Sequence, residues 1–130
     1  MEQRSLVLIL ARDLADKLAS AMFIVDRDGR LVYFNERAES ILGQSFADAG
    51  RMAMDDWAQA YLPSEPGAAA LNPDELPLVV ALREKQPSHR AFRIRAVDGE
   101  ERHIAVTAFP LFSRPDECVG AAAIFWEHGG

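Results

Sequence analysis

Two short runs near the start of the chain have the period of two that is typical of strands. They cover residues 22–26 and 30–34, and β-branched and aromatic residues are common in both. Asp28-Gly29 lies between the runs, and glycine reaches positive φ without steric cost, so the pattern predicts a hairpin with a tight turn. Asn35 follows the second run, where its side-chain oxygen can cap the first turn of a new helix.

A helical period runs through residues 4–20, where apolar residues recur every three to four positions. This spacing predicts an amphipathic helix. Its apolar surface is large for one short helix, so two uses are open: packing on the chain's own sheet, or a homodimer interface with a second copy. The candidate interface residues are Leu6, Val7, Leu10, Leu14 and Leu18.

The middle of the chain predicts helices, and the last third predicts strands. Residues 46–62 are typical of short helical turns, and a longer helix is expected over 75–85, capped by Asn72 or Asp74.

Three strands are predicted over residues 90–97, 102–112 and 119–127, with a second tight turn at Asp98-Gly99. The two early strands and three late strands predict an α+β fold. This fold is a five-stranded antiparallel sheet with helices on one face and the N-terminal amphipathic helix flanking it.

Composition narrows the class of protein. The 130 residues suit one domain, and the net charge of −6 disfavours direct binding to nucleic acid or to an anionic membrane. No apolar run approaches the roughly 20 residues that a membrane-spanning helix needs. The single cysteine, Cys118, cannot form an intramolecular disulfide, so a reducing, cytoplasmic location is expected.

Three segments, taken in order, resemble the PAS family of sensor and interaction domains. They are residues 23–43 (FIVDRDGRLVYFNERAESILG), residues 74–87 (DELPLVVALREKQP), and residues 92–112 followed by 119–127. The resemblance implies a cup in which a small molecule can sit between sheet and helices, with signals leaving through the sheet face and flanking helices. It divides the chain into a flanking dimerisation helix (1–20), a PAS-like domain (21–127) and a tail (128–130).

The resemblance also implies where a ligand would sit, namely between the inner face of the sheet and the middle helices. A filled core without ligand is the alternative interpretation of the same residues. The candidate pocket residues are Val25, Leu42, Trp57, Tyr61, Leu78, Leu82, Phe92, Ile94, Val106 and Ile124.

No cofactor or metal is expected. Haem-binding members of the family supply a histidine from the long helix, but residues 75–85 contain none, and His89 and His103 lie beyond it. Flavin photosensors of the related LOV type carry a reactive cysteine in the helical half, whereas Cys118 precedes the last strand. Asp26 to Gly29 lacks the later oxygen ligands of a calcium loop.

The chain carries no catalytic motif, so we expect a non-enzymatic signal-transduction domain. It would sense a small ligand or a signalling protein partner, dimerise, and regulate a kinase or transcriptional output in trans or within a longer parent protein. A ligand-free dimerisation scaffold and a haem- or flavin-bound redox or gas sensor are the alternatives. The arginines of residues 83–102 allow two interpretations, a solvated strand face or a patch for an acidic partner.

Overall fold

The computed structural model describes residues 6–61 and 72–127. One antiparallel sheet of five strands runs through it in the order β2-β1-β5-β4-β3, which confirms the expected fold class. The two early strands join the three late ones through the pairing of β1 with β5, in which Phe23 faces Ala123. The strands are β1 (Ala21–Asp26), β2 (Leu31–Phe34), β3 (Ser88–Arg95), β4 (Glu101–Arg114) and β5 (Glu117–Glu127).

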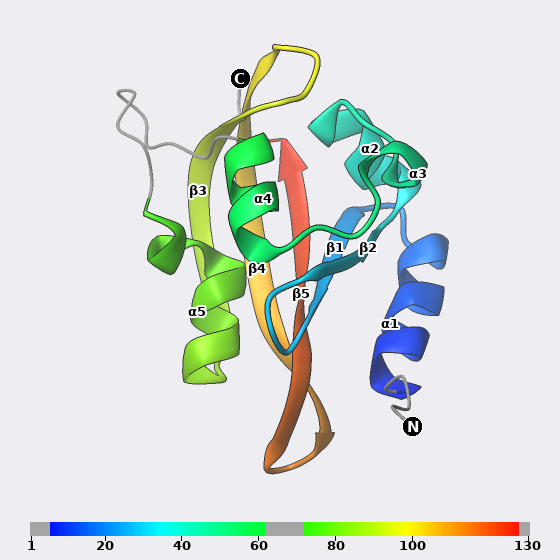
Figure 1. Ribbon diagram of the computed structural model, residues 1–130, viewed down its shortest axis with the longest axis vertical. Helices are drawn as coiled ribbons and strands as arrows, with labels where there is room; N and C mark the ends of the chain where they lie inside the picture. The colour runs from blue at the N-terminus through cyan, green and yellow to red at the C-terminus, as the bar shows by residue number, and fades with distance from the viewer. Residues whose placement is uncertain (1–5, 62–71, 128–130) are drawn as a thin grey trace.

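The helices divide between the two faces of the sheet. Figure 1 shows α4 and α5 in front of the later strands and α1 on the other side of the molecule, beside β1 and β2. The helical elements are α1 (Leu6–Lys17), α2 (Glu36–Leu42), α3 (Phe46–Ala49), α4 (Met54–Ala60), the short 3₁₀ turn η1 (Pro73–Glu75) and α5 (Pro77–Glu84).

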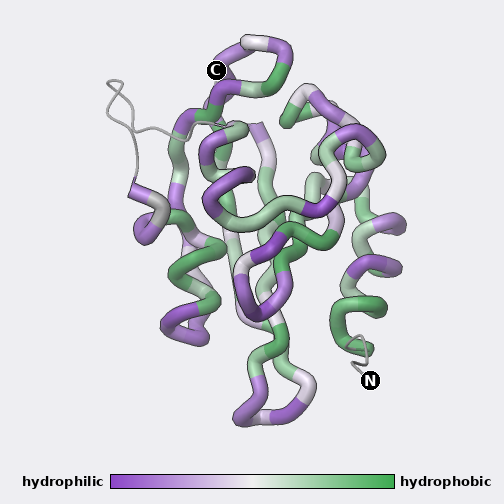
Figure 2. Tube along the Cα trace, viewed as in Figure 1, coloured by the Kyte–Doolittle hydropathy of each residue, from purple (hydrophilic) through white to green (hydrophobic). Residues whose placement is uncertain are grey.

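Two hydrophobic clusters lie on opposite faces of the sheet. The larger one joins the inner face to α2, α4 and α5. The smaller one, on the outer face, is formed by Ala11, Ala15, Met22, Ile24 and Ala122, and the half-buried Leu8 of α1 packs against it. Figure 2 shows that the first half of α1 is hydrophobic and that its second half is largely hydrophilic. Both faces of the central strands are therefore covered by helices.

The first hairpin turn is built by hydrogen bonds from the backbone to one side chain. The Asp26 carboxylate accepts the backbone N–H groups of Asp28 and Arg30 at 2.9 and 3.1 Å. Gly29 has a φ of 81°, a left-handed conformation that glycine adopts without strain. The acidic residues of this segment therefore belong to the turn.

Asn35 connects four segments through its buried side chain, which is 2% exposed. Its Oδ1 accepts the backbone N–H of Ala38, which caps α2, and also the N–H of Met22 in β1, at 3.1 and 3.0 Å. Its Nδ2 donates to the carbonyl oxygens of Ala15 in α1 and Ser20 in the connection to β1, at 2.8 and 2.9 Å. The amide is fully satisfied, and its hydrogen bonds join the end of α1 to the sheet and to α2.

Several element boundaries differ from those expected from the sequence. The first helix ends at Lys17 rather than at residue 20. The α5 helix begins at Pro77 rather than at residue 75, because a proline at the first helical position needs no N–H partner. The Asn72 side chain caps the preceding η1 turn instead, accepting the N–H of Asp74 at 2.9 Å.

The hairpin of β4 and β5 is longer than expected, because only two residues separate Arg114 from its partner Glu117. The expected boundaries of the first helix before residue 6, and the tail 128–130, lie outside the described residues.

We predict that Asn35→Ala destabilises the fold severely. The substitution leaves the N–H groups of Met22 and Ala38 buried without a partner, and each such group costs about 1–3 kcal/mol. We expect a loss of about 3 kcal/mol or more in the free energy of unfolding, measured by urea denaturation.

The matched control for this experiment is Ser45→Ala, which removes the exposed side-chain cap of α3. This cap should be worth about 1 kcal/mol or less, because water replaces it. Equal effects of the two substitutions would contradict a connecting role for Asn35.

Candidate functional site

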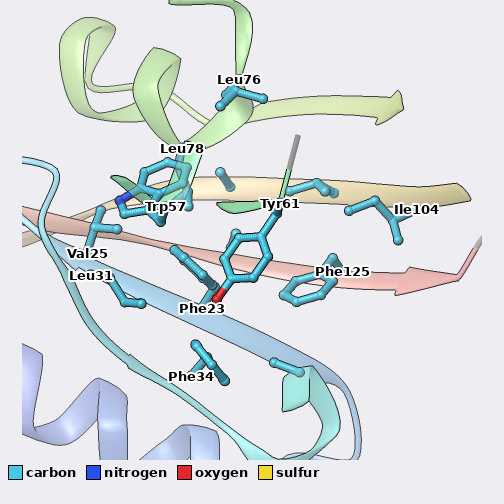
Figure 3. Close-up of a cluster of buried hydrophobic side chains, with 14 of the residues drawn as sticks. Phe23, Val25, Leu31, Phe34, Trp57, Tyr61, Leu76, Leu78, Ile104 and Phe125 are labelled. Carbon is cyan, nitrogen blue, oxygen red and sulfur yellow. The ribbon is translucent and has the colours of Figure 1, made fainter. Parts of the chain in front are cut away.

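A cavity of about 70 Å³ lies between the inner face of the sheet and the α4 and α5 helices. The helical side of its wall consists of Leu42, Trp57, Ala58, Tyr61, Leu76, Pro77 and Leu78. The sheet side consists of Phe23, Phe92, Ile94, Ile104, Val106, Ala123 and Phe125. Figure 3 shows Tyr61 beside Phe23 and Phe125, with Trp57 and Leu78 farther along the same cluster.

The polar atoms of the two amphipathic wall residues are engaged elsewhere. The Trp57 Nε1–H donates to the carbonyl oxygen of Gly29 at 2.8 Å. The Tyr61 hydroxyl donates to Gln44 Oε1 at 3.3 Å. The Phe23 ring meets the rings of Trp57 and Tyr61 edge-on, with centroid distances of 5.3 and 6.4 Å. Only apolar surface therefore faces the cavity among these side chains.

Most of the pocket residues expected from the sequence line this cavity. They are Leu42, Trp57, Tyr61, Leu78, Phe92, Ile94 and Val106. Val25 belongs to the same buried cluster but does not line the cavity, and Leu82 borders a separate polar cleft near the end of α5.

Ile124 is on the wrong face of the sheet for the role expected of it. Opposed residues of an antiparallel pair share a face, and Ile124 is opposed to Met22, which is buried in the cluster under α1. The inward residues of β5 are Ala123 and Phe125. The run of small and large apolar residues in β5 has no polar alternation, so its pattern does not indicate which residues face inward.

The wall residues that the sequence analysis missed are of two kinds. Phe23 and Ile104 have the same strand parity as the expected Val25 and Val106, whereas the parity of Ala123 and Phe125 follows only from the pairing register. Ala58, Leu76 and Pro77 lie on the helical side. The Leu-Pro step at the start of α5 is a visible signal for the last two, because a proline at the first helical position fixes where the helix begins.

The α1 helix turns a row of leucines outward. Leu6, Leu10 and Leu14 are 66%, 58% and 51% exposed, and Ile9 beside them is also exposed. Val7 is half-buried. Leu18 lies beyond the end of α1 and packs against the outer-face cluster, so it does not belong to the exposed row. Because α1 ends at Lys17, Leu18 does not continue the helical row of Leu6, Leu10 and Leu14.

The opposite side of α1 is fixed to the sheet by polar as well as apolar contacts. The Tyr33 hydroxyl donates to Asp16, and the Arg12 guanidinium lies 4.3 Å from the centroid of the Tyr33 ring. Burial, followed by the hydrogen bond to Asp16, raises the pKa of Tyr33 to about 12. Burial alone raises the pKa of Tyr61 to about 12. Both tyrosines are therefore held in their neutral form.

The remaining candidate groups lie away from the cavity. His89 is exposed and places Nδ1 2.9 Å from Thr107 Oγ1, and His103 is also exposed. Cys118 borders the polar cleft near Leu82. The arginines of β3 and β4 lie beside acidic side chains: Arg93 is 3.0 Å from Glu101. These pairings favour the solvated strand face over a patch for an acidic partner.

The described residues contain no grouping of three or more His, Cys, Asp or Glu side chains that could hold a metal ion. Within residues 6–61 and 72–127, no helix is long and apolar enough to cross a membrane.

The family model described as "PAS fold" matches residues 15–128. The chain belongs to the PAS family. The match includes the capped α2 helix, the cavity wall and the end of α1, and this confirms the resemblance found in the sequence. No curated protein matches this PAS domain closely enough to count as similar.

Solved structures share the fold at low sequence identity. The PAS domain of BvgS from Bordetella pertussis is 17% identical, with a TM-score of 0.64 over 95% of this chain and 86% of that one. A LOV protein from Rhodobacter sphaeroides is 16% identical, with a TM-score of 0.74 over 96% and 69%. The LOV domain of a blue-light activated histidine kinase from Erythrobacter litoralis is 23% identical, with a TM-score of 0.65 over 87% and 99%.

Neither flavin nor haem fits the cavity of this PAS domain. Sites for ligands of drug size have volumes of about 300–1,000 Å³ and a few placed polar groups, whereas this cavity has about 70 Å³ and apolar walls. No histidine or cysteine lies among its lining residues. The similarity to the LOV structures, at low identity, therefore supports the fold. The residues that line this cavity do not support a bound cofactor.

We predict a loss of stability at alkaline pH that depends on Tyr33. Its pKa is raised from 10.0 to about 12 in the folded state, so the folded state favours the neutral phenol. The resulting stabilisation is complete below pH 10 and is lost as the pH rises toward 12. The difference in unfolding free energy between wild type and Tyr33→Phe should therefore narrow across that range. A constant difference would refute the prediction, and Tyr61, present in both proteins, serves as the internal control.

Proposed function

We propose that this PAS domain is a signal-transduction module that forms a homodimer through α1 and senses a small ligand or a partner protein through its core. The observation that carries the proposal is the exposed row of Leu6, Leu10 and Leu14 on a helix whose other side is fixed to the sheet. A soluble monomer rarely exposes a contiguous apolar row of this kind, and a second copy of α1 would bury it.

The contacts of β1 support a coupling between the cavity and α1. Phe23 lines the cavity, and the neighbouring Met22 donates its N–H to Asn35, whose amide also holds Ala15 of α1. A ligand that favours one position of β1 would therefore favour one position of α1. Such a ligand shifts a dimer between two arrangements only by its difference in affinity for them.

The proposal includes the output and the location. Regulation of a kinase or of transcription, in trans or within a longer parent protein, is supported by likeness to the PAS domain of a two-component sensor histidine kinase, with 15% identity and a TM-score of 0.59 over 93% of this chain and 96% of that one. In this proposal the chain is divided into a flanking helix (1–20), a sensing domain (21–127) and a tail (128–130). A cytoplasmic location agrees with the single, unpaired Cys118.

A ligand-free dimerisation scaffold is the second candidate function. The small volume of the cavity favours it, because the packed side chains of the core leave little space for a ligand. Both candidate functions require the homodimer, and they differ only in whether the domain responds to a ligand. No contact among the described residues favours the third alternative, a haem- or flavin-bound sensor.

We predict that Leu10→Glu combined with Leu14→Glu prevents dimerisation. Burying unpaired carboxylates in the apolar interface should cost about 3 kcal/mol or more. This corresponds to a dimer dissociation constant raised by roughly a hundredfold or more. Sedimentation velocity over a range of concentrations measures the effect.

The matched control is Val97→Glu, because Val97 is also about half exposed but lies in the β3–β4 turn. This variant should sediment as wild type does. A wild type that is monomeric at the highest attainable concentration would refute the dimer, as would an unchanged dissociation constant in the double variant.

A further inference from the structure

The cavity lacks a hydrogen-bonding partner for a polar occupant. Its wall is formed by apolar side chains, and the polar atoms of Trp57 and Tyr61 are directed to Gly29 and Gln44. A buried water needs two to four polar partners, and apolar cavities without them stay dry. An occupant with a charge or with several polar groups would lose its hydration without compensation.

The volume of the cavity sets an upper limit on the size of an occupant. An engineered protein cavity of about 150 Å³ lined by leucine, isoleucine and phenylalanine holds one benzene molecule. The cavity of this PAS domain, at about 70 Å³, has a similar lining and less space. A ligand of the size of a flavin ring system would have to displace α4 or α5 from the sheet.

We propose that this cavity binds a small, uncharged, apolar molecule that is smaller than a single hydrocarbon ring. This inference rests on the proposed sensing function, because it names the class of ligand that the core accepts. Recognition depends on shape and on the removal of apolar surface from water rather than on hydrogen bonds. The edge-on contacts of Phe23 with Trp57 and Tyr61 place rings in the cavity region with which an apolar molecule can pack.

The test is a titration of the wild-type protein with xenon and with benzene, followed through methyl resonances in NMR spectra. Xenon, the smaller probe, should shift the methyl signals of Leu78, Ile94 and Val106 saturably and leave those of Leu10 unchanged. Benzene, which occupies a cavity of about 150 Å³ elsewhere, should bind more weakly than xenon. Flavin mononucleotide, added as a polar probe, should cause no shift. The proposal is wrong if neither apolar probe shifts the cavity methyl groups, or if the flavin does.

Two substitutions in helices give a matched comparison. Ala58→Leu places a larger side chain in the cavity wall and should weaken binding of the apolar probe about tenfold or more. Ala49→Leu makes the same change in α3, outside the cavity lining, and should leave the affinity within about twofold. Ala123→Val narrows the cavity from the sheet side and should act as Ala58→Leu does. Unchanged affinity in both cavity variants would overturn the proposal.

The outcome is separable from that of the dimer experiment. A wild type that dimerises but ignores both apolar probes overturns the ligand class and favours the ligand-free scaffold. A wild type that binds xenon but stays monomeric overturns the proposed dimer and leaves the ligand class standing.

Discussion

The Asn35 amide is the interaction on which the arrangement of this PAS domain depends. Its two ends complement each other: the oxygen accepts two backbone N–H groups, and the nitrogen donates to two carbonyl oxygens. No other residue type supplies two acceptor sites and two donors in so short a side chain. Because the amide is buried, the N–H groups of Met22 and Ala38 would be costly to leave unsatisfied. The position of α1 on the sheet and the start of α2 are therefore set together.

The consequence is a molecule whose two hydrophobic clusters are connected through one strand. Successive residues of β1 face opposite sides, so Phe23 contributes to the inner-face cavity while Met22 and Ile24 pack under α1. The α1 helix meets the sheet through its alanines, Leu8 and the hydrogen bond of Tyr33 to Asp16, and Leu6, Leu10 and Leu14 face outward. The same helix can thus be part of the domain on one side and an interface on the other.

The order of the elements could be predicted from the sequence because each depends on local chemistry. The Asp-Gly turns and the asparagine cap act over a few residues, and the alternation of Phe92 and Ile94 with arginines reports burial directly. The features that depend on contacts between distant parts of the chain could not be predicted from the sequence. Ile124 was assigned to the wrong face because β5 is apolar at both parities, and its register with β1 is set by contacts a hundred residues apart. Of the four hydrogen bonds of the Asn35 side chain, only the helix cap was predicted, because only folding brings Ala15 and Ser20 to the same amide.

Native-state hydrogen exchange tests the central role of Asn35 most directly. The amide protons of Met22 and Ala38 both bond to Asn35 Oδ1, so they should exchange only through global unfolding. Their exchange free energies should equal that of Ala123 in the central strand β5. If Met22 and Ala38 exchange at a much lower free energy than Ala123, the amide does not hold α1, β1 and α2 together, and the account fails.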